Sequence, residues 1–486
     1  MGYEWRNLVA DHTVWLVIAV FALTIGYAVL NGATLARQQQ RGAQRFLRAQ
    51  EAKTSQFQER AGVMENYLNS AHALADLPRY ERYEYDFGPL DPRYASAANP
   101  LSAVLPPPPL APLTMGVSDL YPVAHTVSWW DTEMVSAAEQ TESPLKLLAG
   151  NFDLAFVMLY LLPLFILALC FNLFASEKEG GTLSLLLSQP INLYMLLAGK
   201  IMARALLILL PAFTFIMAGS LLSGLDLGNS EVRVRLLGWI FVIALYGAFW
   251  FGLAVAVNGI GKSAASNAMI LIVCWLALLV LVPTAANLLA TTLYAVPSRA
   301  EFISASREIP IAVKEIDDTR LREQFFKDHP EFPAGGAYSD WGRMAIVNVA
   351  KQEEVAQRFW ETRQRFDEQL SKQQALVSAC GLLSPAILAQ AALYDIAGAG
   401  TARYRHYLSQ ADAYNREWKA HFWPTMFTGK KFSPADYDRI PRFRGEEERL
   451  IDVARRAAAP MLALLAMASL IVTLGIRAYR RYPIAG

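Results

Sequence analysis

The chain has 486 residues, of which 54% are hydrophobic and only 18% are charged, and this balance excludes an ordinary soluble protein. The formal net charge of +1 gives no electrostatic reason to expect a nucleic acid as partner. The three cysteines, Cys170, Cys274 and Cys380, form no C-x-x-C motif, so the sequence predicts neither a disulfide framework nor a zinc site.

The chain begins with a predicted membrane anchor. Residues 12–30 are apolar over a length close to the roughly 20 residues that cross a bilayer. Residues 1–11, which precede them, are amphipathic rather than basic, and the apolar run is longer than the core of a typical signal peptide. We therefore expect an uncleaved anchor helix within residues 1–31.

A long soluble insertion follows at residues 32–150. Residues 37–77 are rich in Ala, Gln, Glu and Arg, which predicts a helix that continues outward from the first span and ends at Pro78. Residues 86–112 contain many prolines, including four in succession at 106–109, which favours an extended strap rather than a core element.

The second span begins near two polar residues, Asn151 and Asp153. Asn is a good N-cap, and a carboxylate in the first turn is favoured by the helix dipole, so both residues have a structural explanation. A role for Asn151 and Asp153 in binding substrate at the outer mouth is the second interpretation. Pro163 lies inside this span and predicts a kink, provided that neighbours satisfy the carbonyl that it frees.

A short charged segment, residues 175–192, separates the apolar runs 152–174 and 193–222. Its start is polar and contains two glycines, its middle is apolar, and Pro190 ends it. This pattern predicts a turn at one membrane face followed by a short surface helix, with Thr182 as its N-cap. From physics alone, a plain hairpin loop and a functional element explain the segment about equally well.

Three further spans are predicted at residues 236–257, 267–290 and 461–476, with Ala457 as an alternative start of the last one. Lys200 and Arg204, near the start of the third span, are expected to extend to the lipid headgroups. The turn Gly261-Lys262-Ser263 resembles the end of a phosphate-binding loop. It lacks the earlier glycine and the preceding strand of that motif, so we do not expect nucleotide binding there.

The second insertion, residues 291–456, is predicted to be mainly helical. Its region 343–379 has an apolar face that we expect to pack against another helix of the same insertion. Residues 383–399 are apolar but short for a span, which favours a buried or interfacial helix, and residues 403–418 are expected to form a solvated helix edge. The residues of the apolar face are Val355, Phe359, Phe366, Leu370 and Val377.

About six spans place both termini on one side of the membrane. The positive-inside rule decides poorly which side this is, because basic residues stand near span ends on both faces. Those on the side of the termini are Arg6, Lys178, Lys262, Arg477, Arg480 and Arg481, and those on the other side are Arg37, Arg41, Arg233, Arg235, Arg455 and Arg456.

The segment 175–192 resembles the cytoplasmic coupling element of ABC-2 type permeases, in which an acidic–Gly–Thr–Leu run precedes a Gln-Pro or Arg-Pro and then a Gly-Lys. Three other stretches are similar to one branch of that family, which includes permeases of nitrous-oxide reductase maturation and gliding motility: GVSDLYP (116–122), residues 143–164 and residues 382–404. The residues that carry the coupling motif are Glu179, Gly180, Gly181, Thr182, Leu183, Gln189, Pro190, Gly199 and Lys200.

The resemblance implies an all-α polytopic membrane protein in a bacterial inner membrane, with about six transmembrane helices and two mainly helical extracytoplasmic insertions. Spans two to five would lie within 151–290 and the last span and a cytoplasmic tail within 457–486. Its partners would be a separate ABC ATPase subunit, a second permease copy or a sister permease, and the lipid bilayer. The implied ATPase-coupling residues are Glu177, Lys178, Glu179, Gly180, Gly181, Thr182, Leu183, Gln189 and Pro190.

No HExxH, G-x-S-x-G or complete phosphate-binding loop is present, and the six histidines are scattered. We therefore predict no catalytic, cofactor or metal site in this chain. An exporter permease is the first hypothesis, and a non-transporting machine whose motion acts on or matures a periplasmic protein is the second. A receptor or scaffold without an ATPase is the third.

Overall fold

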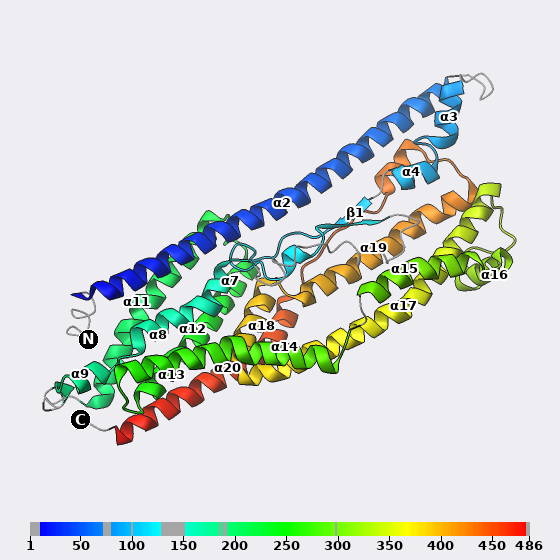
Figure 1. Ribbon diagram of the computed structural model, residues 1–486. Helices are drawn as coiled ribbons and strands as arrows, with labels where there is room; N and C mark the ends of the chain where they lie inside the picture. Colours follow the sequence, from blue (N-terminus) through cyan, green and yellow to red (C-terminus); the bar gives the residue numbers. More distant parts are fainter. Residues whose placement is uncertain are drawn as a thin grey trace.

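The computed structural model describes residues 10–70, 79–98, 101–127, 151–183, 186, 188, 192–296 and 299–482. These residues form an elongated, almost entirely helical molecule, with a bundle at one end and a second helical body at the other (Figure 1). Among them, six helical segments are long and apolar enough to cross a membrane, which confirms the predicted class. They are α2 (His12–Asn69), Leu154–Glu179, α11 (Leu193–Leu222), α12 (Ser230–Asn258), Ala264–Leu293 and α20 (Leu450–Ala478).

Helix α2 joins the first span to the first insertion without a break. Its 58 residues reach about 87 Å at 1.5 Å per residue, and Asp11 caps its start by accepting a hydrogen bond from the Thr13 N–H. The continuous helix confirms the predicted outward extension. It ends at Asn69, earlier than the predicted end at Pro78, which itself lies outside the described residues.

The second span contains a π-helical turn directly before its proline. The span consists of α7 (Leu154–Phe156), the π-helix η3 (Val157–Leu161) and α8 (Leu162–Cys170). The Tyr246 hydroxyl donates to the carbonyl of Leu159, four residues before Pro163, at 2.7 Å. A side chain of a neighbouring helix thus donates to a carbonyl that Pro163 cannot bond, because proline has no backbone N–H.

The fifth span also contains a π-helix shortly before a proline. Its parts are α13 (Ala264–Leu276), the π-helix η4 (Ala277–Leu281) and α14 (Val282–Leu293), and Pro283 follows the π-helix. The Ser384 hydroxyl donates to the Leu278 carbonyl at 2.6 Å. In both spans, therefore, the irregular backbone is stabilised by a side chain from another element.

Helix α12 is the centre of the membrane bundle. Trp239, Tyr246 and Trp250 on this helix are fully buried, and α12 packs against α8, α18 and α20. Helix α18 (Pro385–Ala397) begins directly after Ser384 and lies between α12 and α20. This confirms a buried helix in the predicted segment 383–399.

The two insertions share one hydrophobic core and form a single outer domain. Phe57 and Ala103 from the first insertion pack in the same cluster as Phe325 and Trp418 from the second. Strands β1 (Leu101–Val104) and β2 (Ala124–Val127) pair antiparallel, with Leu101 opposite Val127. The helices of the domain are α3 (Arg79–Phe87), α4 (Pro92–Ala98), η2 (Ser118–Leu120), α15 (Arg299–Lys314), α16 (Asp318–Asp328), α17 (Asp340–Cys380), α19 (Thr401–Thr428) and η6 (Pro434–Arg439). The short helix η5 (Gly381–Leu383) follows α17 and packs against α18 in the membrane bundle.

One prediction for the outer domain is wrong, and a second is correct only in part. The proline-rich segment is a core element, because it contains α4 and β1 and because Leu110 is fully buried against the membrane bundle. The predicted solvated edge is correct for one face only, because Arg405 and Arg416 are exposed whereas Tyr407, Tyr414 and Trp418 of α19 are buried in the core of the outer domain. Aromatic and basic residues alternate there because the aromatic face turns inward and most basic residues turn outward.

The apolar face of α17 meets two different elements. Val355 and Phe359 pack against Val313 of α15, which confirms contact with another helix of the same insertion. Farther along, α17 runs beside α14, and Gln373 donates to the Tyr294 carbonyl at 2.6 Å. The outer end of the fifth span is therefore bound to the outer domain.

Candidate functional site: an elbow at one end of the membrane bundle

Helix α9 (Ala175–Glu179) forms a short elbow between the second and third spans. It lies at the end of the molecule where α2 begins and α20 ends, opposite the outer domain (Figure 1). The predicted coupling segment and the two insertions therefore occupy opposite ends of the bundle.

Each charged residue of the elbow contacts a different part of the bundle. Glu177 forms an ion pair with Lys200 of α11. Lys178 donates to the Gly261 carbonyl at 3.0 Å, in the turn between α12 and α13. Glu179 accepts a hydrogen bond from the Ala264 N–H at 2.9 Å, where the positive end of the α13 dipole favours a carboxylate.

Lys200 and Arg204 do not extend to the headgroups, so that prediction is wrong. The Lys200 residue is 2% exposed, and its Nζ lies 5.2 Å from the centroid of the Phe174 ring. Arg204 is also buried and donates from Nε to the Leu169 carbonyl at 2.7 Å. Both cations turn inward because the elbow and the end of α8 offer them protein acceptors beneath the surface.

Sequence reasoning missed Asn258, the last residue of α12, which is 1% exposed. Its Oδ1 accepts hydrogen bonds from the Leu173 N–H at 3.0 Å and from Asn267 at 3.2 Å. Its Nδ2 donates to the Cys170 carbonyl at 2.9 Å. The available signal was a polar residue at the end of an apolar span, where every polar group in lipid requires a partner.

The elbow also has an apolar underside and an exposed upper side. Phe174 and Leu183 are buried with Tyr479 and Tyr482, which follow the last span. The segment from Glu179 to Thr182 is exposed, and Gly181 has a φ of +70°, a conformation that favours glycine.

The structure describes only part of the predicted coupling segment. Gln189 and Pro190 lie outside the described residues. The Thr182 hydroxyl donates to the Glu177 carbonyl at 3.3 Å. The N–H groups that Thr182 would cap, at positions 184 and 185, belong to residues outside the described part of the chain.

At the second predicted site, Asp153 is buried where the second span meets the first insertion. Asp153, rather than Asn151, caps the second span by accepting a hydrogen bond from the Phe156 N–H at 2.8 Å. Its other oxygen accepts one from the Met115 N–H, also at 2.8 Å, and the Asp153 residue is 2% exposed. This geometry supports the structural explanation of Asp153.

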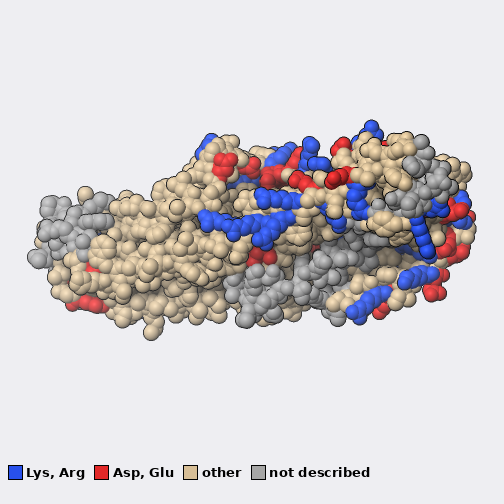
Figure 2. Space-filling model, turned by 90° about the horizontal axis from the view of Figure 1, so that it is seen from above, with Lys and Arg blue, Asp and Glu red and all other residues tan. Residues whose placement is uncertain are grey.

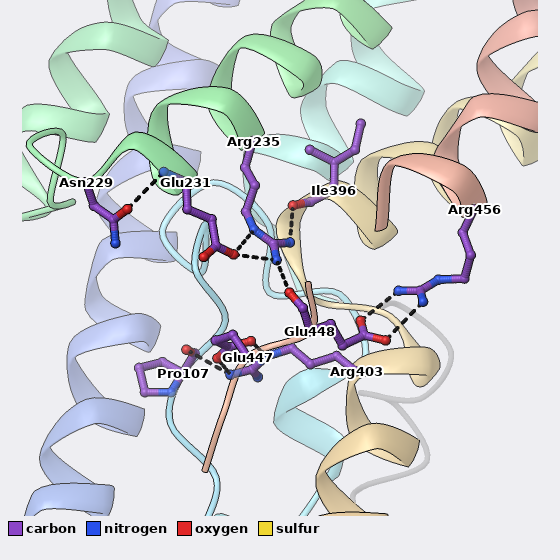
Figure 3. Close-up of polar contacts among 9 residues, drawn as sticks. All are labelled: Pro107, Asn229, Glu231, Arg235, Ile396, Arg403, Glu447, Glu448 and Arg456. Carbon is purple, nitrogen blue, oxygen red and sulfur yellow. Dashed lines mark hydrogen bonds and ion pairs between the residues drawn. The ribbon is translucent and has the colours of Figure 1, made fainter. Parts of the chain in front are cut away.

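A second polar cluster, which we name the outer clamp, joins the spans to the outer domain (Figure 3). Arg235 of α12 pairs with Glu231 at 2.8 Å and donates to the Ile396 carbonyl at 3.1 Å. Arg403 of α19 pairs with Glu447 and donates to the Pro106 and Pro107 carbonyls. The outer clamp comprises Glu231, Arg235, Arg403, Glu447, Glu448 and Arg456.

Two of the arginines that oppose the positive-inside rule, Arg235 and Arg456, belong to the outer clamp. Arg235 is buried and bound to its partners, and Arg456 of α20 pairs with Glu448 at 2.7 Å. Among the described residues, no group of three or more His, Cys, Asp or Glu side chains is placed to hold a metal ion.

Comparisons with known proteins match two separate parts of the chain. Residues 111–273, which include the elbow and all of α12, match the family model described as ABC-2 family transporter protein. Residues 299–445 match a domain of unknown function, DUF3526.

One curated relative is a "Probable ABC transporter permease protein NosY" from Stutzerimonas stutzeri. It is 30% identical over 106 residues, which cover 19% of this chain and 38% of that relative. The match therefore spans well under half of either protein. No solved structure matches the chain.

Proposed function

Because this chain contains an ABC-2 family transporter domain, we propose that it is the permease subunit of an ABC transporter in a bacterial inner membrane. A separate ABC ATPase subunit hydrolyses ATP and docks on the cytoplasmic elbow. The permease works with a second copy of itself or with a sister permease, and the cycle drives export. The outer domain lies on the far side of the membrane.

The set of bonds around α9 is the observation that carries this proposal. The elbow is tied to α11 through Lys200, to the turn directly after α12 through the Gly261 carbonyl and to α13 through Ala264. A force on α9 therefore acts on three spans at once. The exposed segment from Glu179 to Thr182 stays available for a partner at the membrane surface.

A second candidate is an ATP-driven machine that acts on a protein outside the membrane. The outer clamp favours this function, because α12 is bound at both ends: Asn258 binds the Leu173 N–H just before the elbow, and Arg235 binds the Ile396 carbonyl near the outer domain. The two insertions also share one core, so a motion passed through α12 would reach the outer domain as a unit.

The proposal is tested with the permease co-purified with its native ATPase and reconstituted in liposomes. The permease alone should hydrolyse no ATP. Glu179→Ala and Gly181→Val should each lower ATP turnover of the complex at least about tenfold, because they alter the exposed docking segment and, at Gly181, strain a left-handed backbone.

Matched controls are Glu361→Ala and Gly335→Val in the outer domain. Glu361 is exposed, and no heavy atom lies near the position that a Cβ would take at Gly335, as is also true at Gly181. Unchanged ATP turnover in both elbow variants, with the complex intact, would contradict the proposed coupling.

A further inference from the structure

Most of the basic residues near the outer ends of the spans are bound within the protein. Arg37 donates to the Leu222 carbonyl at 2.8 Å, and Arg233 donates to the Leu227 and Gly228 carbonyls at 2.7 Å. Arg235 and Arg456 belong to the outer clamp. These four residues therefore have structural roles.

Arg455 of α20 is exposed, and three exposed arginines lie together on α2: Arg41, Arg45 and Arg48, which we name the arginine stripe. They form no hydrogen bond or ion pair with the described part of the chain. Spacings of four and three residues place them on one face of α2, above Arg37. Figure 2, which views the molecule from the side of α2, shows basic side chains beginning where the uncharged part of the surface ends.

The same face of α2 is open within the bilayer. Leu23, Tyr27 and Leu30 continue the spacing of four and three below Arg37, and they are 74%, 61% and 65% exposed. The Phe152 ring lies beside Tyr27, with the ring centroids 5.5 Å apart, but all three residues stay more than half exposed among the described elements. A lipid whose acyl chains lie along the apolar residues would therefore have its headgroup beside the arginines.

The heights of the three arginines fit a headgroup layer. Arg37 marks the end of the third span, because it reaches the last residue of α11. At a rise of 1.5 Å per residue, the backbone positions of Arg41, Arg45 and Arg48 lie about 6, 12 and 17 Å beyond that of Arg37 along α2. Helical side chains lean toward the helix N-terminus, which here lies in the direction of the membrane, so each guanidinium is lowered toward the phosphates.

We propose that the arginine stripe binds the phosphate groups of anionic phospholipids in the leaflet on the side of the insertions. A guanidinium can donate two parallel hydrogen bonds to a phosphate, and its long stem can lie along the apolar surface below. Because α2 continues without a break into the outer domain, the bound lipids hold that domain at a set height and tilt above the membrane. This inference requires only that the chain spans a membrane, and not that it transports.

The test uses the full chain in nanodiscs of equal parts phosphatidylglycerol and phosphatidylcholine, with retained lipids counted by mass spectrometry. Wild-type protein should retain phosphatidylglycerol in excess. Replacing all three arginines, Arg41→Gln, Arg45→Gln and Arg48→Gln, should lower that enrichment at least about tenfold. Single substitutions should weaken it in the order Arg41, Arg45, Arg48, because the attraction falls over a Debye length of about 8 to 10 Å.

The control variant removes the same charge from the outer domain with Arg320→Gln, Lys327→Gln and Arg416→Gln, and it should keep the wild-type enrichment. Replacing the stripe by lysines should keep most of it. Equal enrichment in the stripe variant and in wild type would overturn the proposal.

A second copy of the chain is the rival occupant of this face. In nanodiscs of phosphatidylcholine alone, a stripe variant that changes from dimer to monomer would assign the stripe to a contact between copies and overturn lipid binding. An unchanged oligomeric state, together with lost phosphatidylglycerol enrichment in mixed nanodiscs, supports the lipid.

Discussion

Single buried polar residues hold the elbow in place. Lys200 and Asn258 are almost fully buried near the end of an apolar bundle, where an ionised or amide side chain without partners is costly. Each has its partners: Glu177 faces Lys200, and the backbone of residues 170 and 173 faces Asn258. These contacts couple the position of α9 to the packing of the bundle.

The ion pair between Glu177 and Lys200 should show strong coupling. Glu177→Gln leaves a buried ammonium without its counter-ion, and we expect a loss of about 3 kcal/mol in the free energy of unfolding. Adding Lys200→Met should recover much of that loss, because no charge then remains buried. Unfolding of both variants in mixed detergent micelles checks this, and a double variant less stable than Glu177→Gln would contradict it.

Asp91 in the outer domain should make stability depend on acid pH. Burial opposes its ionisation, but the hydrogen bond from Arg93 and the charge of Lys431 outweigh burial and lower the pKa of Asp91. The stabilisation is present above the unfolded-state pKa of about 4 and is lost as the pH falls through the lower folded-state pKa. The stability difference between wild type and Asp91→Asn should therefore be constant near neutral pH and shrink below about pH 4, as pH-dependent unfolding would show. A difference that grows on acidification would contradict the prediction.

At the scale of elements, the second span depends on a side chain from α12. The Tyr246 hydroxyl satisfies the Leu159 carbonyl four residues before Pro163. Tyr246→Phe should cost about 1 to 3 kcal/mol, because it leaves a buried carbonyl unpaired. With Pro163→Ala also present, a new N–H can reach that carbonyl, so Tyr246→Phe should cost less. A double-mutant cycle of unfolding free energies measures the difference, and additive effects would contradict the explanation.

The elements that sequence reasoning placed incorrectly, in whole or in part, share one physical cause. The helical character of α19 follows from its own residues, but the burial of its aromatic face depends on β1 and η6, which lie elsewhere in the sequence. Tyr407, for example, donates to the Ala103 carbonyl at 2.6 Å across 304 positions. The proline-rich segment is a core element for the same reason, because its Leu110 N–H donates to the Ala397 carbonyl of α18 and its Pro106 carbonyl accepts from Arg403 of α19.

At the scale of the whole molecule, DUF3526 residues 299–445 should not fold as an independent unit. Their core includes Phe57 and Ala61 of α2 and residues of α4 and β1. A fragment of residues 299–445 should lack a cooperative thermal transition, whereas the full chain should show one. A cooperative transition in the isolated fragment would contradict a shared core.

The outer clamp should carry motion between the two ends of the molecule. Spin labels at the exposed positions Leu237 of α12 and Arg416 of α19 report the distance between the spans and the outer domain. In the complex with its ATPase, ATP turnover should change that distance. Arg403→Met should reduce the change while ATP hydrolysis continues, because it breaks the contacts with Glu447 and Pro106. An unchanged distance during turnover in wild type would favour export over a mechanical role.

The sequence alone determined the six spans, the helical outer regions and the position of the elbow, because apolar length and helical composition are local properties of a chain. The tertiary structure decided which polar residues meet. Glu177 finds Lys200 across 23 positions, and Arg403 finds Pro106 across 297. No periodicity encodes such pairs, because the folding of the segments between them brings their partners together.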